Sequence, residues 1–455
     1  MSTVEQQVAY IEKYVIYDIL KYFGKDYTVV SHTVDFTNGI GFMSTLYTVE
    51  LKLQLDERIE NKTLVVKFMK GSPEFRETSK SYTQFANEIY AYAEVLPAYE
   101  HLLRSSHLNT DIVSEFVPRS FLAKFGVLDN LSTDRESVLA LKHLKNDGYT
   151  LEPSLALRRD QLEAMCALVG KYHALGYATR ILQPQVHERL KSGVVPLQFT
   201  TAEGQPPGVY DVLHGVAFAR FFEYYERQKS IEQDSGLDAA LKRLKEKYLD
   251  KPAELLERIR TQSCDESQPD SYFSTILHGD YNRNNVLFHY GPDGKVDNIK
   301  MLDFQELRFS TIALDLSFFM YMNIPFDQRS TFFPQLLKYY HKNVYEMLEL
   351  VLQRNQGENS LTKDQVDQYL SNYSFERFQS HFKRYAFYGV MICMHFLPWL
   401  LAEKAECDKL SYLFETNMHG PEFYQLSIDI AGDAANQEIF NIVRHAYEQG
   451  YMDEI

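Results

Sequence analysis

The sequence predicts an α+β protein with two lobes, the first rich in strands and the second mainly helical. In the first third of the chain, apolar and polar residues alternate and β-branched and aromatic side chains are frequent, which indicates strands at 29–55, 63–69, 121–125 and 138–141. After residue 159 the apolar residues recur at helical spacing, and a short strand-rich stretch at 276–304 interrupts them. Because binding sites favour the junction between such units, we expect a cleft between the two lobes.

The first lobe begins with an amphipathic helix predicted over 8–23. The stretch 29–55 is divided by Asn38-Gly39-Ile40-Gly41, so it indicates two strands joined by a glycine turn. Glycine lets the backbone approach a ligand closely, so the turn with Gly39 and Gly41 fits a loop that covers phosphates, and it fits a plain hairpin turn equally well. A second helix is expected over 82–103, after the strand at 63–69.

Helical periodicity continues through the second lobe. It predicts helices at 164–174, 212–227, 237–260 and from residue 314 onward. The stretch 194–208 is rich in proline, glycine and polar residues, which predicts a loop. We expect the lobes to comprise residues 1–141 and 149–455, with residues 142–148 as the hinge between them.

The charge of the chain limits its partners. The 455 residues include 62 acidic and 47 basic side chains, which gives a net charge of −15. Nucleic acids would be repelled by this excess of acid, so we expect no nucleic-acid partner. The four cysteines show no C-x-x-C spacing, which argues against a zinc site or a disulfide framework. No secretory signal is apparent and the most apolar stretch, 391–401, is too short for a membrane span, so we expect a cytoplasmic protein.

The most informative motif reads His278-Gly279-Asp280-Tyr281-Asn282-Arg283-Asn284-Asn285. An Asp followed five residues later by an Asn and then by a short apolar strand is typical of a kinase catalytic loop. Phosphoryl transfer needs a carboxylate that accepts or orients the proton of the attacking hydroxyl, and a neutral oxygen ligand for magnesium close to it. Asp280, in the same triplet as His278, fits the first role, and Asn285 fits the second.

Two further acids follow the motif. Asp303 lies eighteen residues past Asn285, at the end of an apolar strand, where its carboxylate can bind a Mg²⁺ ion that bridges phosphates. The segment 290–294 between them is rich in turn residues, so Asn285 and Asp303 flank a predicted hairpin. Asp315 opens a helix twelve residues later, either as an N-terminal helix carboxylate or as a brace for the catalytic loop, and we favour the brace.

Lys67 interrupts the apolar strand at 63–69. A lysine in this position must extend to the rim of the sheet or meet an anion, such as the phosphates of ATP. Glu88, on the following helix, is its natural partner. Other glutamates are also near in the sequence: Glu57, Glu60, Glu74 and Glu77. The chain contains no G-x-x-x-x-G-K-[ST] sequence, so a P-loop enzyme is not supported.

On these residues the chain resembles the ecdysteroid kinase-like (choline-kinase-like) family, which is related to aminoglycoside phosphotransferases and choline kinases. The residues that carry the resemblance are His278-Gly279-Asp280 with Asn285, Leu302-Asp303-Phe304-Gln305, Asp315-Leu316, and Lys67 with Glu88. The Asp-Phe-Gln form, in place of Asp-Phe-Gly, points to this family and away from protein kinases.

The resemblance implies a two-lobed protein-kinase-like fold with ATP and Mg²⁺ as cofactors. It also implies a small hydroxylated acceptor, such as an ecdysteroid or a foreign compound. Asp280 would be the catalytic base, Asn285 and Asp303 the magnesium ligands, and Lys67, positioned by Glu88, the ligand of the ATP phosphates.

The same resemblance places adenine against the backbone of the hinge, at Leu141, Lys142 and Leu144. Two other functions stay open. A protein of this fold that binds a nucleotide or a lipophilic ligand without catalysis would agree with Lys142-His143 at a position where the family usually carries an acidic residue. A choline or aminoglycoside kinase would agree with the 14% aromatic content, which could build a cage for a quaternary ammonium group. The order of the motifs and the Asp-Phe-Gln form fit the ecdysteroid kinase-like family better.

Overall fold

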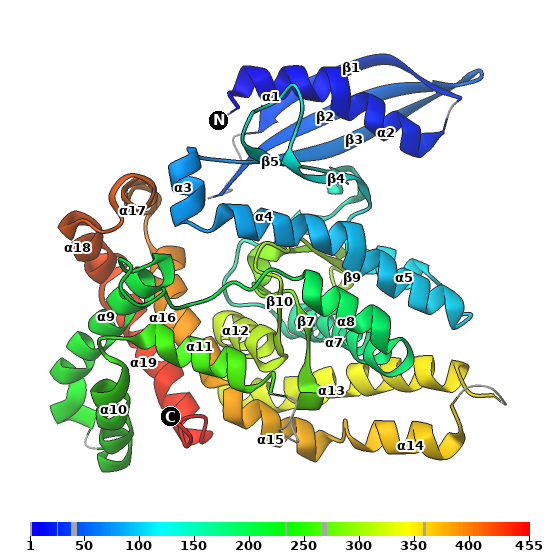
Figure 1. Cartoon of the computed structure of the whole chain (residues 1–455). Coiled ribbons are helices and arrows are strands. Elements are labelled where there is room, and N and C mark those ends of the chain that lie inside the picture. The colour runs from blue at the N-terminus through cyan, green and yellow to red at the C-terminus, as the bar shows by residue number, and fades with distance from the viewer. Residues whose placement is uncertain (1, 25, 38–42, 233, 266–270, 358–360) are drawn as a thin grey trace.

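The computed structural model describes residues 2–24, 26–37, 43–232, 234–265, 271–357 and 361–455. The N-terminal part is built on a five-stranded antiparallel sheet, at the top of Figure 1, and the C-terminal part is mainly helical, as predicted. The order of the strands in the sheet is β1-β2-β3-β5-β4. Their bounds are β1 (Tyr27–Thr37), β2 (Ser44–Leu55), β3 (Arg58–Met69), β4 (Ser120–Val127) and β5 (Arg135–Lys142).

One face of this sheet is covered by the first helices. They are α1 (Val4–Tyr10), a single π-helical turn (Ile11–Val15) and α2 (Ile16–Phe23). The helical run begins four residues earlier than the predicted 8–23 because Thr3 caps it. The Thr3 hydroxyl accepts a hydrogen bond from the Gln6 amide at 3.2 Å, and the Gln6 side chain accepts one from the Thr3 amide at 2.8 Å.

The alternation of β3 directs Lys67 away from these helices. Leu64, Val66 and Phe68 pack beneath α1 and α2 in one apolar cluster. Because successive side chains of a strand point to opposite faces, Lys67 faces the other side of the sheet. There Met69 packs against Tyr82 and Phe85 of α4 (Ser81–Tyr90), so α4 lies against the face that carries Lys67.

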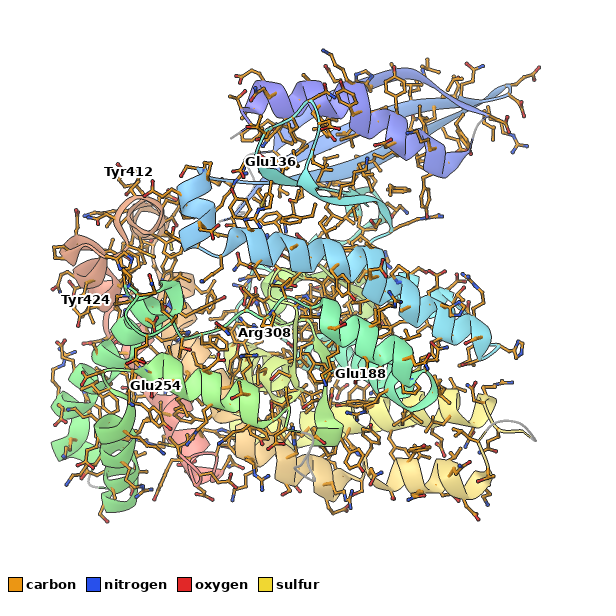
Figure 2. All side chains as sticks on the ribbon, in the orientation of Figure 1. Glu136, Glu188, Glu254, Arg308, Tyr412 and Tyr424 are labelled. Atoms are coloured by element: carbon orange, nitrogen blue, oxygen red, sulfur yellow. The ribbon has the colours of Figure 1, made fainter. Side chains whose placement is uncertain are left out.

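The helix predicted over 82–103 is confirmed as one run of α4, a π-helical turn (Ala91–Val95) and α5 (Leu96–Ser105). In Figure 1 this run crosses the molecule between the sheet and the helical part. The short helix before it, α3 (Pro73–Thr78), is held to the sheet by a buried ion pair. Arg76 Nη1 lies 3.0 Å from Oε1 of Glu136, and both side chains are fully buried. Figure 2 labels Glu136 in the region of the sheet.

The helical part is organised around buried central helices. α12 (Ala313–Asn323) is buried along its whole length and packs against α16 (Phe387–Leu401). A Cβ atom on Gly389 would lie 2.3 Å from the Ser317 carbonyl carbon, so glycine allows this close approach. α7 (Arg159–Leu182) and α13 (Arg329–Arg354) also pack together. The surrounding helices are α6 (Asp111–Phe116), α8 (Pro184–Gly193), α9 (Val209–Glu232), α14 (Lys363–Ser371), α15 (Phe375–Tyr385), α17 (Lys404–Asn417), α18 (Pro421–Asp429) and α19 (Gly432–Glu448).

The prediction of one helix over 237–260 is wrong. The chain forms α10 (Ser235–Tyr248) and α11 (Pro252–Gln262) instead. Pro252 has no amide hydrogen to continue the first helix, and its fixed φ suits the first position of a new one. The stretch 194–208 contains no helix or strand, as predicted.

Two small sheets lie within the helical part. β7 (Ser274–Leu277) pairs with β10 (Arg308–Thr311), and β8 (Val286–Tyr290) pairs with both β9 (Val296–Met301) and β6 (Thr150–Leu151). The predicted strand-rich stretch is therefore confirmed, and Asp303 follows the end of β9. Among the residues that the structure describes, no helix has an apolar stretch long enough to cross a bilayer.

We predict that the protein loses stability as the pH falls below about 6.5, the ordinary pKa of histidine. His381 is fully buried, and burial lowers its pKa to about 3. The unfolded chain therefore takes up a proton at a pH where the folded chain does not, which costs about 1.4 kcal/mol of folding free energy per pH unit below 6.5 for one imidazole. Urea unfolding between pH 7 and pH 5 measures this loss.

His381→Gln should make the loss shallower, because the titrating group is gone from both states. The exposed His101, changed to Gln, is the matched control and should keep the wild-type dependence. Equal slopes for His381→Gln and the wild type would contradict the account.

Candidate active site

The loop that follows β7 brings Asp280 and two asparagines together. The Asp280 carboxylate accepts hydrogen bonds from Asn282 Nδ2 at 2.9 Å and from Asn285 Nδ2 at 2.7 Å, and Asn285 Nδ2 also donates to the Asp280 carbonyl at 2.9 Å. A 3-10 turn (Arg283–Asn285) closes the loop, with the Asn282 side chain accepting from the Asn284 amide at 2.8 Å. The turn explains the five-residue spacing, because it folds the chain back so that Asn285 meets Asp280.

The carboxyl group of Asp280 lies in a site that disfavours its charged form. Burial raises its pKa well above the ordinary range, and the charges of Glu306 and Asp303 raise it further. The hydrogen bonds from Asn285 and Asn282 act in the opposite direction, because they stabilise the carboxylate. The two asparagines thus orient a half-buried carboxylate, which is the geometry that a proton acceptor needs.

Asp315 holds the backbone of this loop. It lies in the first turn of α12 and is 1% exposed. Its Oδ2 oxygen accepts from the His278 amide at 2.9 Å and its Oδ1 oxygen accepts from the Gly279 amide at 2.8 Å. His173 of α7 lies 3.1 Å from the same Oδ2 oxygen through its Nε2 atom. Asp315 therefore has the contacts of a brace and does not reach the Asp280 carboxylate.

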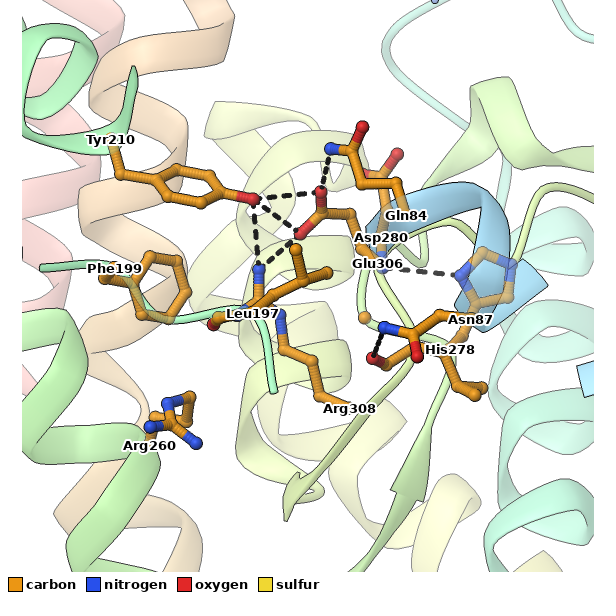
Figure 3. Close-up of polar contacts among 12 residues, drawn as sticks. Gln84, Asn87, Leu197, Phe199, Tyr210, Arg260, His278, Asp280, Glu306 and Arg308 are labelled. Carbon is orange, nitrogen blue, oxygen red and sulfur yellow. Dashed lines mark hydrogen bonds and ion pairs between the residues drawn. The ribbon is translucent and has the colours of Figure 1, made fainter. Parts of the chain in front are cut away.

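His278 has the contacts of a positioning residue. Its side chain is fully buried, and its Nε2 atom lies 2.7 Å from the Leu302 carbonyl oxygen. Leu302 precedes Asp303, so this hydrogen bond ties the loop of Asp280 to the segment that follows β9. The Asp280 amide donates to the other ring nitrogen, Nδ1, at 3.4 Å, as Figure 3 shows.

Lys67 lies between two carboxylates from distant parts of the chain. Its Nζ atom is 2.9 Å from Glu88 Oε2 on α4 and 3.2 Å from Asp303 Oδ1 after β9. Burial lowers the pKa of Lys67, but the charges of Asp303 and Glu88 outweigh this effect and raise it. Burial raises the pKa of Glu88, which Lys67 opposes. Of the glutamates near Lys67 in sequence, the structure thus brings Glu88 to it.

Asn285 and Asp303 lie at the same end of the β8–β9 hairpin. The Leu302 amide donates a hydrogen bond to the Asn285 carbonyl at 2.8 Å. This bond extends the pairing of the two strands to the residues next to the turn-distal end, where Asn285 and Asp303 lie. Asp303 adopts the left-handed conformation, with φ of 62°, and its side chain is 35% exposed. Asn285 bonds Asp280 through its nitrogen, which leaves its side-chain oxygen for another partner.

This donor set fits magnesium. Mg²⁺ prefers oxygen ligands and commonly takes one or two from the protein and the rest from phosphates and water. Asn285 and Asp303 offer one amide oxygen and one carboxylate. No group of three or more His, Cys, Asp or Glu side chains suited to a metal occurs in the described part of the chain, so any metal here would depend on such additional ligands.

The residues predicted to form the hinge, 142–148, begin at Lys142, the last residue of β5. The Lys142 amide donates to the Arg119 carbonyl at 2.8 Å within the sheet, and the Lys142 ammonium forms a 2.7 Å ion pair with Asp147. The positive charge of Lys142 is thus balanced locally. Leu141 is half-buried at the end of β5 and Leu144 is buried. Over the residues that the structure describes, the Leu144 amide makes no backbone hydrogen bond. Gly39 and Gly41 lie outside the described residues.

A second polar cluster beside Asp280 was not predicted from the sequence. Glu306 accepts hydrogen bonds from Gln84 Nε2 at 2.6 Å and from the Tyr210 hydroxyl at 3.1 Å, and it forms an ion pair with Arg308 (Figure 3). Glu306 and Arg308 follow shortly after the Asp-Phe-Gln motif. Two opposite charges among apolar residues at this point of the sequence are an indication of a polar site. Gln84 and Tyr210 give no such signal, because packing alone brings them there.

Gly279 is required where the loop touches this cluster. Its φ is +87°, and a Cβ atom there would lie 1.7 Å from the Glu306 carbonyl oxygen. We predict that Gly279→Ala destabilises the protein by about 1–2 kcal/mol for the left-handed conformation and by about 1–3 kcal/mol more for the steric overlap. Chemical unfolding measures the loss.

Gly294→Ala is the matched control for that variant. Gly294 also has a left-handed φ, +75°, but no atom lies within 4 Å of its added Cβ. This control should lose only the part of the stability that comes from the left-handed conformation, about 1–2 kcal/mol. Equal losses for the two variants would show that Glu306 does not press against the loop.

The chain also matches a known protein family. A model of the ecdysteroid kinase-like family matches residues 38–353, more than half of the chain, and this range contains Lys67, Glu88, Asp280, Asp303 and Asp315. No curated protein gives a significant match. The chain therefore belongs to the ecdysteroid kinase-like family.

Proposed function

We propose that the protein is an ATP- and Mg²⁺-dependent phosphotransferase that phosphorylates a hydroxyl group of a small molecule. The observation that carries the proposal is the convergence of Asp280, Asn285 and Asp303 with the buried Lys67–Glu88 pair. We place it in a two-lobed protein-kinase-like fold with lobes at 1–141 and 149–455 and a hinge at 142–148. The kinase-like family and the strand-rich and helical parts of the chain support this fold.

The nucleotide would bind between Lys67 and the hinge. Lys67 is directed away from the α1–α2 core, and one of its two carboxylate partners, Asp303, is partly exposed. A phosphate group could therefore reach the ammonium by displacing Asp303 or by binding beside it. The ion pair with Glu88 would keep the Lys67 ammonium group in place. The Leu144 amide, and the backbone of Leu141 and Lys142, would meet the adenine.

Asp280 would accept the proton of the attacking hydroxyl. Its carboxylate is oriented by Asn282 and Asn285, and its backbone is fixed through His278 and Gly279 by Asp315. Asn285 and Asp303 would hold Mg²⁺, which when bound neutralises charge on the phosphates. The chain thus contributes mainly by positioning groups before the reaction and by placing charges that stabilise the transferred phosphoryl group.

For the acceptor we favour an uncharged hydroxylated compound, such as an ecdysteroid, another steroid or a foreign compound. The choline or aminoglycoside alternative is disfavoured, because the protein's own Arg308, the partner of Glu306, lies over the rings of Phe199 and Tyr210. We also favour catalysis over the non-catalytic alternative, because the charge of Lys142 that motivates this alternative is paired with Asp147.

We predict that Asp280→Asn lowers kcat by at least about 100-fold, the usual contribution of a general base, while MgATP still stabilises the fold. Transfer of label from γ-labelled ATP to a panel of hydroxysteroids and hydroxylated xenobiotics measures the first effect, and thermal unfolding measures the second. The isosteric change keeps the shape of the loop but removes the proton acceptor.

Asp293→Asn, at an exposed position in the turn between β8 and β9, is the matched control and should keep full activity. Unchanged turnover in Asp280→Asn would refute the assignment of the base. MgATP binding by the wild type without transfer to any acceptor would favour a non-catalytic binding protein.

A further inference from the structure

Arg308 is bound inside the protein in the manner of a cationic ligand. Its guanidinium carbon lies 4.3 Å from the centre of the Phe199 ring and 5.9 Å from that of Tyr210. Its Nη1 atom donates to the Leu197 carbonyl at 2.5 Å, and its Nη2 atom forms the ion pair with Glu306. We call Leu197, Phe199, Tyr210 and Glu306 the Glu306 cage. Arg308 is 3% exposed, so it fills this cage, and Figure 2 labels it near the centre of the view.

The Glu306 cage adjoins the proposed catalytic base. The Glu306 carbonyl presses against Gly279, the residue before Asp280, and Figure 3 shows the Glu306 side chain between Tyr210 and Asp280. The Glu306 side chain keeps 19% of its surface exposed, whereas that of Arg308 keeps only 3%. Glu306 is thus the member of the ion pair that has exposed surface left, and Arg308 lies behind it.

The groups of the cage are those that bind alkylammonium ions. Aromatic faces attract a cation through the ring quadrupole, and a carboxylate and a carbonyl oxygen add charge and hydrogen-bond acceptors. A carboxylate that is largely withdrawn from water is stabilised by a partner charge, and Arg308 supplies this charge to Glu306 from within the chain. His214, whose ring centre lies 6.5 Å from that of Tyr210, does not supply this charge, because burial lowers its pKa well below the ordinary value.

We propose that Arg308 is a specificity-determining residue, which occupies a carboxylate–aromatic cage beside Asp280 and thereby excludes cationic acceptors. The proposal rests on the proposed function, since an acceptor must place its hydroxyl at Asp280. It narrows the acceptor to molecules that carry no ammonium group close to the reacting hydroxyl. Without Arg308, Glu306 keeps its hydrogen bonds from Gln84 and Tyr210 but loses its compensating charge, so the cage becomes a site for a free cation.

The test compares the binding of choline and of tetramethylammonium by thermal unfolding. Arg308→Gln removes the charge and keeps a donor that can reach the Leu197 carbonyl. At a large excess of choline over its dissociation constant, we expect a saturable rise of about 2–4 °C in the Tm of this variant, and none for the wild type. Arg308→Lys, which keeps a cation beside Glu306, should also show no rise.

The double variant Glu306→Gln/Arg308→Gln is the matched control, because it lacks both charges and should show no rise. Arg308→Met provides the same test if Arg308→Gln does not fold. The proposal is overturned if folded Arg308→Gln or Arg308→Met responds to neither cation. It is also overturned if the response persists in the double variant, or if the wild type already binds choline saturably. The experiment measures cation binding, so it tests the role of Arg308 even if the protein has no phosphotransferase activity. Failure of this proposal can therefore be distinguished from failure of the proposed function.

Discussion

The buried ammonium group of Lys67 is the constraint on which the rest of the site depends. An unpaired charge at this depth would cost several kcal/mol, so the chain must bring carboxylates to it. Glu88 comes from α4 and Asp303 from the segment after β9, and this one cation therefore joins the sheet, the helix beneath it and the helical part of the molecule. Asp303 is the more exposed of the two acids, so it is the partner that a phosphate or a metal ion can reach.

The same segment connects both sides of Asp280. Asp303 faces Lys67, while Glu306, three residues later, faces Gln84 and Tyr210. Gln84 and Glu88 lie one turn apart on α4, so this helix contacts the proposed nucleotide side and the proposed acceptor side at once.

Local patterns were sufficient to predict much of this arrangement. The alternation in β3 directs Lys67 away from the apolar core, and the spacing of Asp280 and Asn285 is that of a tight turn. The break at Pro252 was missed because the apolar period continues across it, although the proline was visible in the sequence. The Glu306 cluster could not be predicted, because it joins residues 96 and 222 positions away, which only tertiary packing brings together. The sequence pattern around Glu306 does not indicate which of the many distant polar residues it contacts.

The central claim is that Lys67 and Asp303 form a site for the phosphates of ATP together with Mg²⁺. Calorimetric titration with ATP, in Mg²⁺ and in EDTA, tests it most directly when the wild type is compared with Asp303→Asn. The account predicts that the wild type binds ATP in Mg²⁺, and that either chelation or the substitution weakens this affinity by at least about tenfold, the equivalent of about 1.4 kcal/mol. An ATP affinity that responds to neither change would contradict it.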